Sequence, residues 1–276
     1  MKLTKFLVAG LIGATVFSLT SCIFFDLSDP MEVKTKKDMK LVWSDEFDYT
    51  GVPNTTKWKY ETGRNGGWGN NELEDYQDNT TKSTTAFVED GHLKIKAFYD
   101  NGVWKSARMN SKQSWKYGYI EARLKVTNKR GAWPAFWMMP QKSVYGGWPD
   151  SGEIDIMENA PSTAGENNVF SSLHARGHFA EKPKSIGKNN FGSNFGKEWH
   201  TFAISWDENK ITCFYDDVAQ ETYYNDGTGY VNWPYDQEFF VILNLAIGGD
   251  LGGTGDAASL QSTGAEFLVD YVRVYQ

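Results

Sequence analysis

Three acidic residues lie close together in one apolar segment, residues 153–158: they are Glu153, Asp155 and Glu158. If the segment is a strand, alternate residues share a face, so Glu153 and Asp155 project together while the isoleucines beside them face the core. Carboxylates on an apolar strand cost free energy unless they pair or take part in chemistry. The spacing therefore predicts that this segment carries the reactive groups.

The third acid, Glu158, shares this face only if the strand is irregular. Strict alternation puts Met157 rather than Glu158 on the side of Asp155. A β-bulge at Ile156 and Met157 corrects this, because a bulge adds one residue to a strand and re-aims the side chains that follow. We therefore predict a bulge at that point.

Two carboxyl groups that face a groove suit the hydrolysis of a glycosidic bond. One attacks the anomeric carbon and the other protonates the leaving oxygen, and in the retaining route they lie about 5 to 5.5 Å apart. A bulged strand spaces Glu153 and Glu158 by about 13 Å along its axis, so curvature and converging side chains must close the gap. Asp155 is expected to hold a proton or a hydrogen bond that keeps Glu153 ionised and Glu158 protonated. A solvated acidic face is the alternative, and the apolar and aromatic neighbours disfavour it.

The elements that position these acids are predicted to be short strands. Period-two patterns and short apolar runs, bounded by Gly, Asn, Asp and Pro, follow one another along the chain. No segment has a helical stripe of useful length, so the domain is predicted to be all-β. A β-jelly-roll sandwich of two curved antiparallel sheets offers a concave cleft for a polymer, whereas a closed barrel holds a small ligand at most. The clearest strands are expected at residues 118–126, 201–206, 210–215, 239–246 and 267–275, with a turn at 207–209.

Composition narrows the substrate class. The 276 residues carry a net charge of −7 without a long basic run, which argues against a nucleic-acid partner. Aromatic residues make up 15% of the chain and include 11 Trp, more than core packing usually requires. Flat indole faces suit sugar rings, so a neutral carbohydrate is expected. The sequence has neither a zinc-type His/Cys spacing nor a glycine-rich phosphate loop, so no catalytic cofactor is expected.

The N-terminus has the pattern of a bacterial lipoprotein. A basic start and an apolar stretch over residues 6–19 predict a signal peptide over residues 1–21. Residues 19–22 resemble a lipobox, which predicts lipidation of Cys22 and attachment to a membrane. An ordinary secretory signal is the alternative. Ile23 is not acidic, which favours the outer membrane or the cell surface.

After the lipidated cysteine, residues 22–39 are predicted to form a tether and residues 40–276 a single β-jelly-roll domain. We expect this domain to be a monomer. If Cys22 is lipidated, Cys213 has no partner for a disulfide. Cys213 lies in a predicted strand, so it is expected to be a small buried hydrophobic residue rather than a reactive thiol.

Several segments of the chain resemble a known family. Residues 152–158 resemble the active-site signature of glycoside hydrolase family 16, in the form with the inserted Met that matches the predicted bulge. The resemblance implies a β-jelly roll and a retaining double displacement, with Glu153 as nucleophile, Asp155 as helper and Glu158 as general acid/base. The bulged form is typical of laminarinase-like members. Further segments resemble the family in the same order along the chain: residues 41–47, 70–76, 117–123, 131–137 and 269–275.

The resemblance also implies a set of substrate-binding residues in the cleft. Tryptophans at matching positions would stack on sugar rings, although Trp137 could equally belong to the core, and Trp68 is expected to be exposed on a loop at the cleft edge. Polar residues at matching positions would bond sugar hydroxyls, or alternatively cap loops. Asn244 interrupts an apolar strand and needs a hydrogen-bond partner, for which a substrate hydroxyl is one candidate. The full set is Trp133, Trp137, Trp148, Trp68, Arg108, Asn71, Glu72, His174 and Asn244.

Members of the family often carry a calcium ion away from the catalytic cleft. Calcium takes oxygen ligands, and Glu46, the carbonyl of Gly91 and Asp270 fall at the matching places. Such an ion would join the first and last strands. The alternative is that these acids only cap strand ends.

The leading hypothesis is a hydrolase of β-1,3-glucan or of mixed-linkage β-1,3/1,4-glucan. A hydrolase of galactans such as agar or porphyran is the first alternative, but such enzymes need room and positive charge for sulfate groups, and the expected cleft segments contain no basic cluster. A surface glycan-binding lipoprotein without activity is the second, and the presence of all three acids disfavours it. Linkage preference depends on the loops at residues 63–71 and 140–148, whose shape the sequence does not determine.

Overall fold

The computed structural model describes residues 32–276. The predicted signal peptide, Cys22 and the first part of the predicted tether lie outside the described residues. None of the helices in the described part is long and apolar enough to cross a membrane.

The larger of two sheets contains ten strands. Their bounds are β1 (Leu41–Asp45), β3 (Glu74–Tyr76), β4 (Ala86–Glu89), β5 (His92–Asp100), β6 (Val103–Ser106), β8 (Gly118–Val126), β13 (His200–Trp206), β14 (Lys210–Tyr215), β15 (Val218–Tyr224) and β17 (Ala265–Tyr275). Eight of them follow the order β15-β14-β13-β8-β17-β5-β6-β3, while β1 pairs with β17 and β4 pairs with β5. The pairing of β3 with β6 is parallel, and the other pairings in this sheet are antiparallel.

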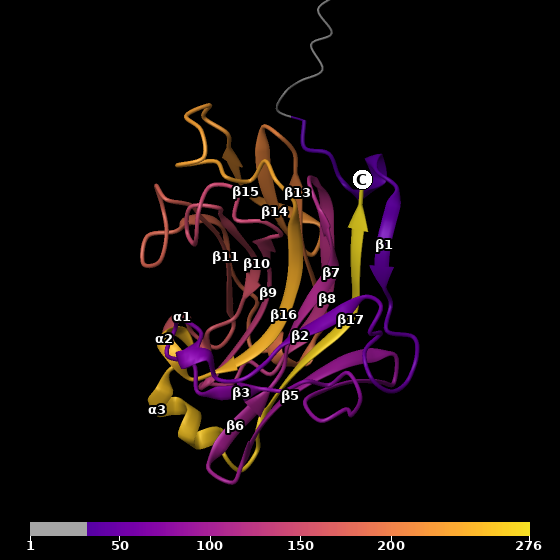
Figure 1. Ribbon diagram of the computed structural model, residues 1–276, viewed down its shortest axis with the longest axis vertical. Helices are drawn as coiled ribbons and strands as arrows, with labels where there is room; N and C mark the ends of the chain where they lie inside the picture. The colour runs from indigo at the N-terminus through magenta and orange to yellow at the C-terminus, as the bar shows by residue number, and fades with distance from the viewer. Residues whose placement is uncertain (1–31) are drawn as a thin grey trace, which may run out of the picture. The chain divides into compact units, whose positions relative to one another are not determined.

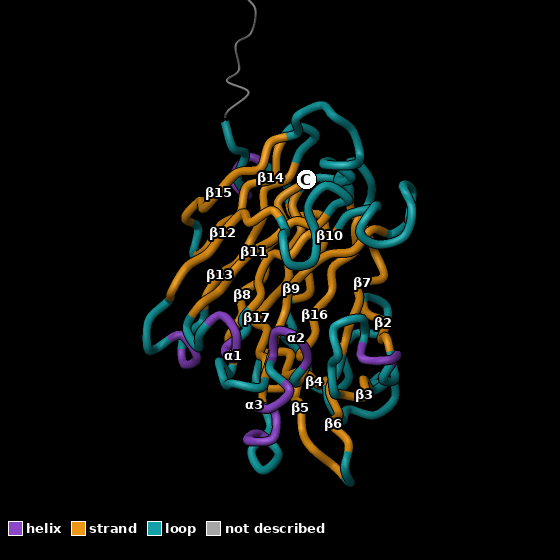
Figure 2. The backbone as a smooth tube through the Cα atoms, turned by 90° about the vertical axis from the view of Figure 1, so that its left-hand side faces the viewer, coloured by secondary structure: helices purple, strands orange, loops and turns teal. Residues whose placement is uncertain are grey.

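The smaller sheet contains seven strands in the order β12-β11-β10-β9-β16-β7-β2, all antiparallel. It packs against the larger sheet, so the predicted two-sheet sandwich is confirmed (Figures 1 and 2). The bounds are β2 (Trp58–Glu61), β7 (Arg108–Trp115), β9 (Ala132–Pro140), β10 (Glu153–Glu158), β11 (Asn168–His174), β12 (Lys184–Asn190) and β16 (Phe239–Ile247).

The five strands predicted most clearly are present. Strands β8 and β14 have the predicted bounds, and β13, β16 and β17 are each longer than predicted by one or two residues. The turn after β13 makes a hairpin, in which Trp206 lies opposite Ile211. Period-two patterning was a sufficient guide here because these strands each have one face in the core.

One hydrophobic core fills the space between the sheets. Phe202 and Ile120 reach it from the larger sheet, and Phe136 and Leu243 reach it from the smaller one; all are at most 1% exposed. Burying a side chain of this size contributes about 1.5–3 kcal/mol. Cys213 is also buried in this core as a free thiol, as predicted. Because side chains alternate along a strand, residues next to the core positions of the smaller sheet project onto its opposite face.

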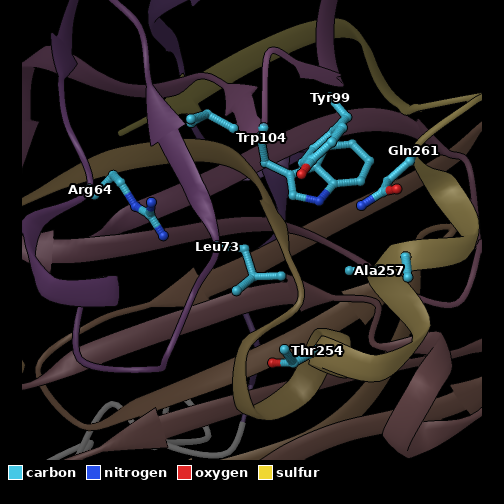
Figure 3. A pocket seen from close by; sticks show the side chains of 10 residues that line it. Arg64, Leu73, Tyr99, Trp104, Thr254, Ala257 and Gln261 are labelled. Carbon is cyan, nitrogen blue, oxygen red and sulfur yellow. The ribbon is translucent and has the colours of Figure 1, made fainter.

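The helices of the described residues are short. They are the α-helices α1 (Pro161–Ala164), α2 (Gly249–Gly252) and α3 (Thr254–Ala257), and the 3₁₀ helices η1 (Lys36–Asp38), η2 (Asn65–Gly67), η3 (Phe195–Lys197) and η4 (Ala258–Leu260). Three of them, α2, α3 and η4, connect β16 to β17. A pocket lies between α3 and the β5–β6 hairpin (Figure 3).

The predicted tether ends earlier than expected. The folded unit begins at Val33 rather than at residue 40. Val33 and Met39 pack against the cluster of Tyr119, Ala203 and Phe214. Lys36 donates a hydrogen bond at 2.6 Å to Glu121 and forms an ion pair at 2.8 Å with Asp217. The sequence prediction missed this because a segment of seven residues without periodicity gives no sign of the contacts it makes.

Candidate active site

The predicted bulge is present in β10. Along β9, Asp155 lies opposite Trp137 and Met157 lies opposite the adjacent Phe136, so Ile156 is the extra residue. Ile154, Ile156 and Met157 are all buried in the core. The extra residue turns Glu158 to the face that already carries Glu153 and Asp155, and all three line one cavity on the face away from the core.

Each of the two glutamates accepts a hydrogen bond from a tryptophan. The indole Nε1 of Trp133 donates to Glu158 Oε1 at 2.9 Å, and that of Trp148 donates to Glu153 Oε2. Trp133 is 9% exposed and lines the cavity, whereas Trp148 is 50% exposed and lies on the loop before β10. Trp133 therefore fixes the position of Glu158 from within the cleft, while Trp148 contacts Glu153 from the rim.

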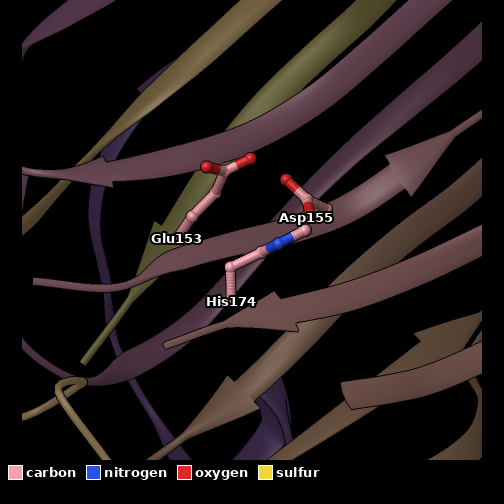
Figure 4. Close-up of side chains that lie close together, drawn as sticks. All are labelled: Glu153, Asp155 and His174. Atoms are coloured by element: carbon pink, nitrogen blue, oxygen red, sulfur yellow. Dashed lines mark ion pairs between the residues drawn. The ribbon is translucent and has the colours of Figure 1, made fainter. Parts of the chain in front are cut away.

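His174 contacts Asp155 rather than the open cavity. It lies opposite Glu153 on the neighbouring strand β11, and its Nε2 is 3.0 Å from Asp155 Oδ2, a buried oxygen with no hydrogen bond among the described residues (Figure 4). The amide of Ala180 donates to Nδ1 of His174 at 3.2 Å, so in the neutral ring the proton is on Nε2, facing Asp155. Among the described residues His174 contacts Asp155, and its predicted contact with substrate stays a prediction.

The same tautomer argues against a metal ion at this point. Glu153, Asp155 and His174 bring ligand atoms within 4.8 Å of one another. A metal at Nε2 needs the imidazole proton on Nδ1, where the Ala180 amide already donates. The arrangement suits proton sharing between carboxyl groups better than metal coordination.

Burial raises the pKa of all three carboxyl groups. The pKa of Glu153 rises to about 8, first through burial and then through the negative charge of Asp155. Burial raises the pKa of Asp155 to about 7, although its hydrogen bond with Glu153 lowers it. The pKa of Glu158 rises well above its ordinary value through burial and the charge of Asp155.

Three carboxyl groups this close share protons at neutral pH instead of all ionising. A proton on Glu158 is the one a general acid must donate. The hydrogen bond between Glu153 and Asp155 holds a second proton. For Glu153 to attack a carbon, this proton must lie on Asp155. The carboxyl group of Asp155 then donates a hydrogen bond to the ionised Glu153.

A row of opposed residues forms the floor of the cavity across five strands. Starting from Glu158, the row continues through Ala135, Asn244 and Arg108 to Glu61, each lying opposite the next on a neighbouring strand. Side chains opposed in this way project to the same face. The sheet therefore places Arg108 in the same cleft as the acids, three strands away from β10 and at 9% exposure.

Arg108 is enclosed by two tryptophans. Its guanidinium lies 4.8 Å from the ring centroid of Trp68 and 4.7 Å from that of Trp137, and its Nε donates to Glu61. Trp68 also packs edge-on against Tyr76. Trp68 was predicted to be exposed, but it is half-buried because it covers Arg108. Trp137 lines the cavity, which decides against the core alternative.

A chain of hydrogen bonds connects this floor to the loop segment at its edge. Trp137 Nε1 donates to Asn244 Oδ1 at 2.8 Å, Asn244 Nδ2 donates to Tyr76 Oη at 3.0 Å, and Tyr76 donates to Glu72 Oε2 at 2.9 Å. Asn244 and Glu72 both line the cavity. The partner that Asn244 needed is thus supplied by the protein itself, and its amide orients Trp137 toward the cleft.

A buried glutamate, Glu74, contacts Glu72. The two carboxyl groups share a hydrogen bond, and burial together with this bond and the charge of Glu72 raises the pKa of Glu74 well above its ordinary value. The amide of Ile247 donates to the other oxygen of Glu74 at 2.7 Å. Glu74 is therefore protonated and donates its hydrogen bond to Glu72, which holds the Glu72 carboxyl group in the cleft.

Asn71 does not lie in the cleft, contrary to the prediction. It has a left-handed backbone with φ of 57°, and its amide donates to Asp250 at 2.8 Å. Its neighbour Asn70 lines the cavity instead and donates to Glu72 Oε1 at 3.2 Å. The alternation from Asn70 through Glu72 to Glu74 was visible in the sequence and would have selected Asn70.

The fold agrees with comparisons to known proteins. The model of the glycosyl hydrolases family 16 matches residues 72–272. The chain belongs to this family. The beta-glucanase of Rhodothermus marinus is 36% identical, with 100% of this chain and 95% of that protein covered. The glucan endo-1,3-beta-glucosidase of Cryptopygus antarcticus is 37% identical, with coverage of 84% and 90%. The solved laminarinase from Rhodothermus marinus has a TM-score of 0.78 at 36% identity, covering 86% of this chain and 97% of that one.

Membership of family 16 confirms the resemblance noted in the sequence and makes the protein a glycoside hydrolase. It does not carry the calcium site with it. Glu46 accepts from Arg273 with both oxygens, at 3.0 and 2.7 Å, and Asp270 pairs with Arg123 at 2.7 Å. Both carboxylates are thus paired with arginines in this structure, and calcium binding at Glu46, Gly91 and Asp270 stays a prediction.

Replacing Asp155 with asparagine is expected to move both limbs of the pH–activity profile of this hydrolase to lower pH, by about one unit. The negative charge of Asp155 raises the pKa of Glu153 and Glu158, so its removal lowers both. Activity falls at low pH as Glu153 gains a proton and at high pH as Glu158 loses one. Profiles of kcat/KM against pH for the wild type, Asp155→Asn and the exposed control Asp48→Asn test this. An alkaline limb that stays in place would refute the coupling.

Replacing Glu158 with glutamine is expected to raise the melting temperature at pH 8 by about 3 °C and to leave it unchanged at pH 4. The folded-state pKa of Glu158 lies above its ordinary value. Its contribution to the free energy of unfolding is therefore present below about pH 4.5 and is lost as the pH rises toward the folded-state pKa. Glutamine does not titrate, so its contribution is the same at both pH values. Melting curves at both pH values, with Glu221→Gln as exposed control, measure this. A lower melting temperature of Glu158→Gln at pH 8 would contradict it.

Replacing Arg108 with lysine is expected to raise KM by about tenfold while kcat changes less than about threefold. A lysine cannot fill the space between two indole rings or present a planar set of donors to sugar hydroxyls. The matched control is Arg123→Lys, because Arg123 also lies over a tryptophan, Trp199, but on the larger sheet. Steady-state kinetics on a soluble glucan decide the outcome, and an unchanged KM would remove Arg108 from the substrate site.

Proposed function

We propose that this protein is a retaining endo-β-glucanase that hydrolyses β-1,3-glucan, mixed-linkage β-1,3/1,4-glucan or both. One observation carries the proposal: the bulge at Ile156 brings Glu153, Asp155 and Glu158 to one face of β10, at the floor of a cleft lined by Trp133 and Trp137. Paired carboxyl groups beside indole faces suit a neutral sugar polymer. The relatives named beta-glucanase, laminarinase and glucan endo-1,3-beta-glucosidase support the glucan assignment.

In the first step Glu153 attacks the anomeric carbon and forms an ester bond to the sugar. The bond to the leaving oxygen breaks, and Glu158 donates its proton to that oxygen, so the departing chain leaves as an alcohol. Asp155, held by His174, keeps the proton that Glu153 must not carry. In the second step Glu158 removes a proton from water, whose oxygen replaces Glu153 at the anomeric carbon with overall retention of configuration.

The product profile of the mature domain on laminarin, barley mixed-linkage glucan and agarose tests this proposal. Cleavage of either glucan into short oligosaccharides, with relative rates that show the linkage preference, is expected. Cleavage of agarose alone would establish the galactan alternative. Binding without cleavage of any polymer would establish the glycan-binding alternative.

We also propose that the protein is a lipoprotein of the cell envelope, held at the outer membrane or cell surface through Cys22. Support comes from the lipobox-like residues 19–22 alone. Expression of the full chain in a bacterial host with labelled palmitate is expected to label the wild type and place it in the membrane fraction. Cys22→Ser should lose the label and leave that fraction, and an unlabelled wild type would exclude lipidation.

A further inference from the structure

A second cavity lies apart from the catalytic cleft. It has a volume of about 230 Å³ and lies between Arg64, Leu73, the β5–β6 hairpin and the segment of α3 and η4 (Figure 3). No residue lines both cavities. They lie on two sides of one segment, because Glu72 faces the cleft and the next residue, Leu73, faces the second cavity.

The second cavity combines an aromatic corner with unused hydrogen-bonding groups. The rings of Tyr99 and Trp104 lie 5.5 Å apart, and Tyr99 is 37% exposed. Across the described residues, five polar side chains around this cavity form no side-chain hydrogen bond or ion pair, although they converge on the same space. These are Arg64, Tyr99, Trp104, Thr254 and Gln261.

The chemistry of this lining selects its ligand. Hydroxyl, amide, indole and guanidinium groups bond hydroxyl oxygens, and no acidic residue lines the cavity. An apolar wall with a few convergent polar groups is the usual form of a small-ligand site. At about 230 Å³ the cavity is smaller than the about 300–1,000 Å³ of sites for drug-sized ligands, which suits a single sugar ring or the end of a chain.

We propose that this cavity is a second glycosyl-binding site, which holds a glucosyl unit of the same β-glucan that enters the catalytic cleft. The proposal rests on the proposed function for the identity of the sugar. Glu72 and Leu73 are consecutive, with Cα atoms about 3.8 Å apart, so a single segment separates the two cavities, and the proposed polymer occupies both. Simultaneous contact at two sites raises the overall affinity for a long chain and leaves a short one unaffected.

The test uses the double variant Tyr99→Ala with Gln261→Ala and, as a matched control, the exposed Tyr224→Ala on β15. Native gels that contain laminarin measure binding, with each variant made in the Glu153→Gln background so that the polymer stays intact. The affinity for laminarin, measured as retardation in the gel, is expected to fall about fivefold in the double variant, because an aromatic contact and a hydrogen bond are lost. It is expected to be unchanged in the control. In the active protein, turnover of a short glucan oligosaccharide should change less than about twofold.

Retention equal to that of the control would overturn the proposal. An equal loss of turnover on the short oligosaccharide would also overturn it, because the cavity would then be part of the catalytic cleft. If the double variant melts at a lower temperature than the wild type, Arg64→Ala replaces it, since that side chain is exposed and forms no side-chain hydrogen bond or ion pair with the described residues. Failure of the wild type to cleave any glucan would refute the proposed function separately, whatever the gels show.

Discussion

Replacing Glu153 with glutamine is expected to reduce glucan hydrolysis by at least about 10⁴-fold, the loss typical of removing a catalytic nucleophile. The amide has the shape of the carboxyl group and still accepts the hydrogen bond from Trp148. It cannot form the ester with the anomeric carbon, because an amide is a poor nucleophile. Binding of laminarin should therefore stay within about threefold of wild type, since the stacking surfaces of the cleft are untouched.

The measurement pairs initial rates on laminarin with binding of laminarin in native gels. The matched control is Glu221→Gln, an exposed change of the same type on β15, which should keep full activity. Residual activity within about tenfold of wild type would show that Glu153 is not the nucleophile. Loss of both binding and activity would point to misfolding, which a melting curve distinguishes.

Replacing Glu158 with alanine is expected to reduce hydrolysis by about 10²–10⁴-fold, the usual contribution of a general acid or base. The loss should be smaller for an aryl glycoside, because a good leaving group departs without the proton that Glu158 supplies. Azide should restore part of the rate. It is a nucleophile that needs no base, and it can enter the space that the shortened side chain leaves beside Trp133.

Rates with and without azide, on laminarin and on an aryl β-glucoside oligomer, measure this. The product of the rescued reaction should be a glycosyl azide of retained configuration, which identifies the step that azide replaces. No rescue together with an equal loss on both substrates would indicate that another residue is the acid. Asp155 would then be the next group to test, since it is 3% exposed and lines the same cavity.

The sequence predicted the parts of the site that depend on one strand. Alternation placed Glu153 and Asp155 on one face, and the apolar type of Met157 required the bulge that turns Glu158 to join them. The strands of the core were predicted for the same reason, because a buried face leaves a period of two in the sequence.

What the sequence did not predict depends on contacts between distant segments. His174 was expected to touch substrate, but its position opposite Glu153 across the β10–β11 pairing brings it to Asp155. Asn71 was predicted from its place in the family-like segment, but its left-handed backbone turns its side chain to Asp250, and Asn70 lines the cavity instead. The neutralisation of Glu46 by Arg273 joins residues at opposite ends of the folded unit, and spacing along the chain carries no sign of it.

The anomeric form of the first sugar released from laminarin tests the central claim most directly. Proton NMR of the reaction in its first minutes reports it, before mutarotation mixes the two anomers. The arrangement of Glu153, Asp155 and Glu158 predicts that the new reducing end appears as the β-anomer, the configuration of the bond that was cut. First appearance of the α-anomer would contradict a covalent intermediate on Glu153, and with it the account of this active site.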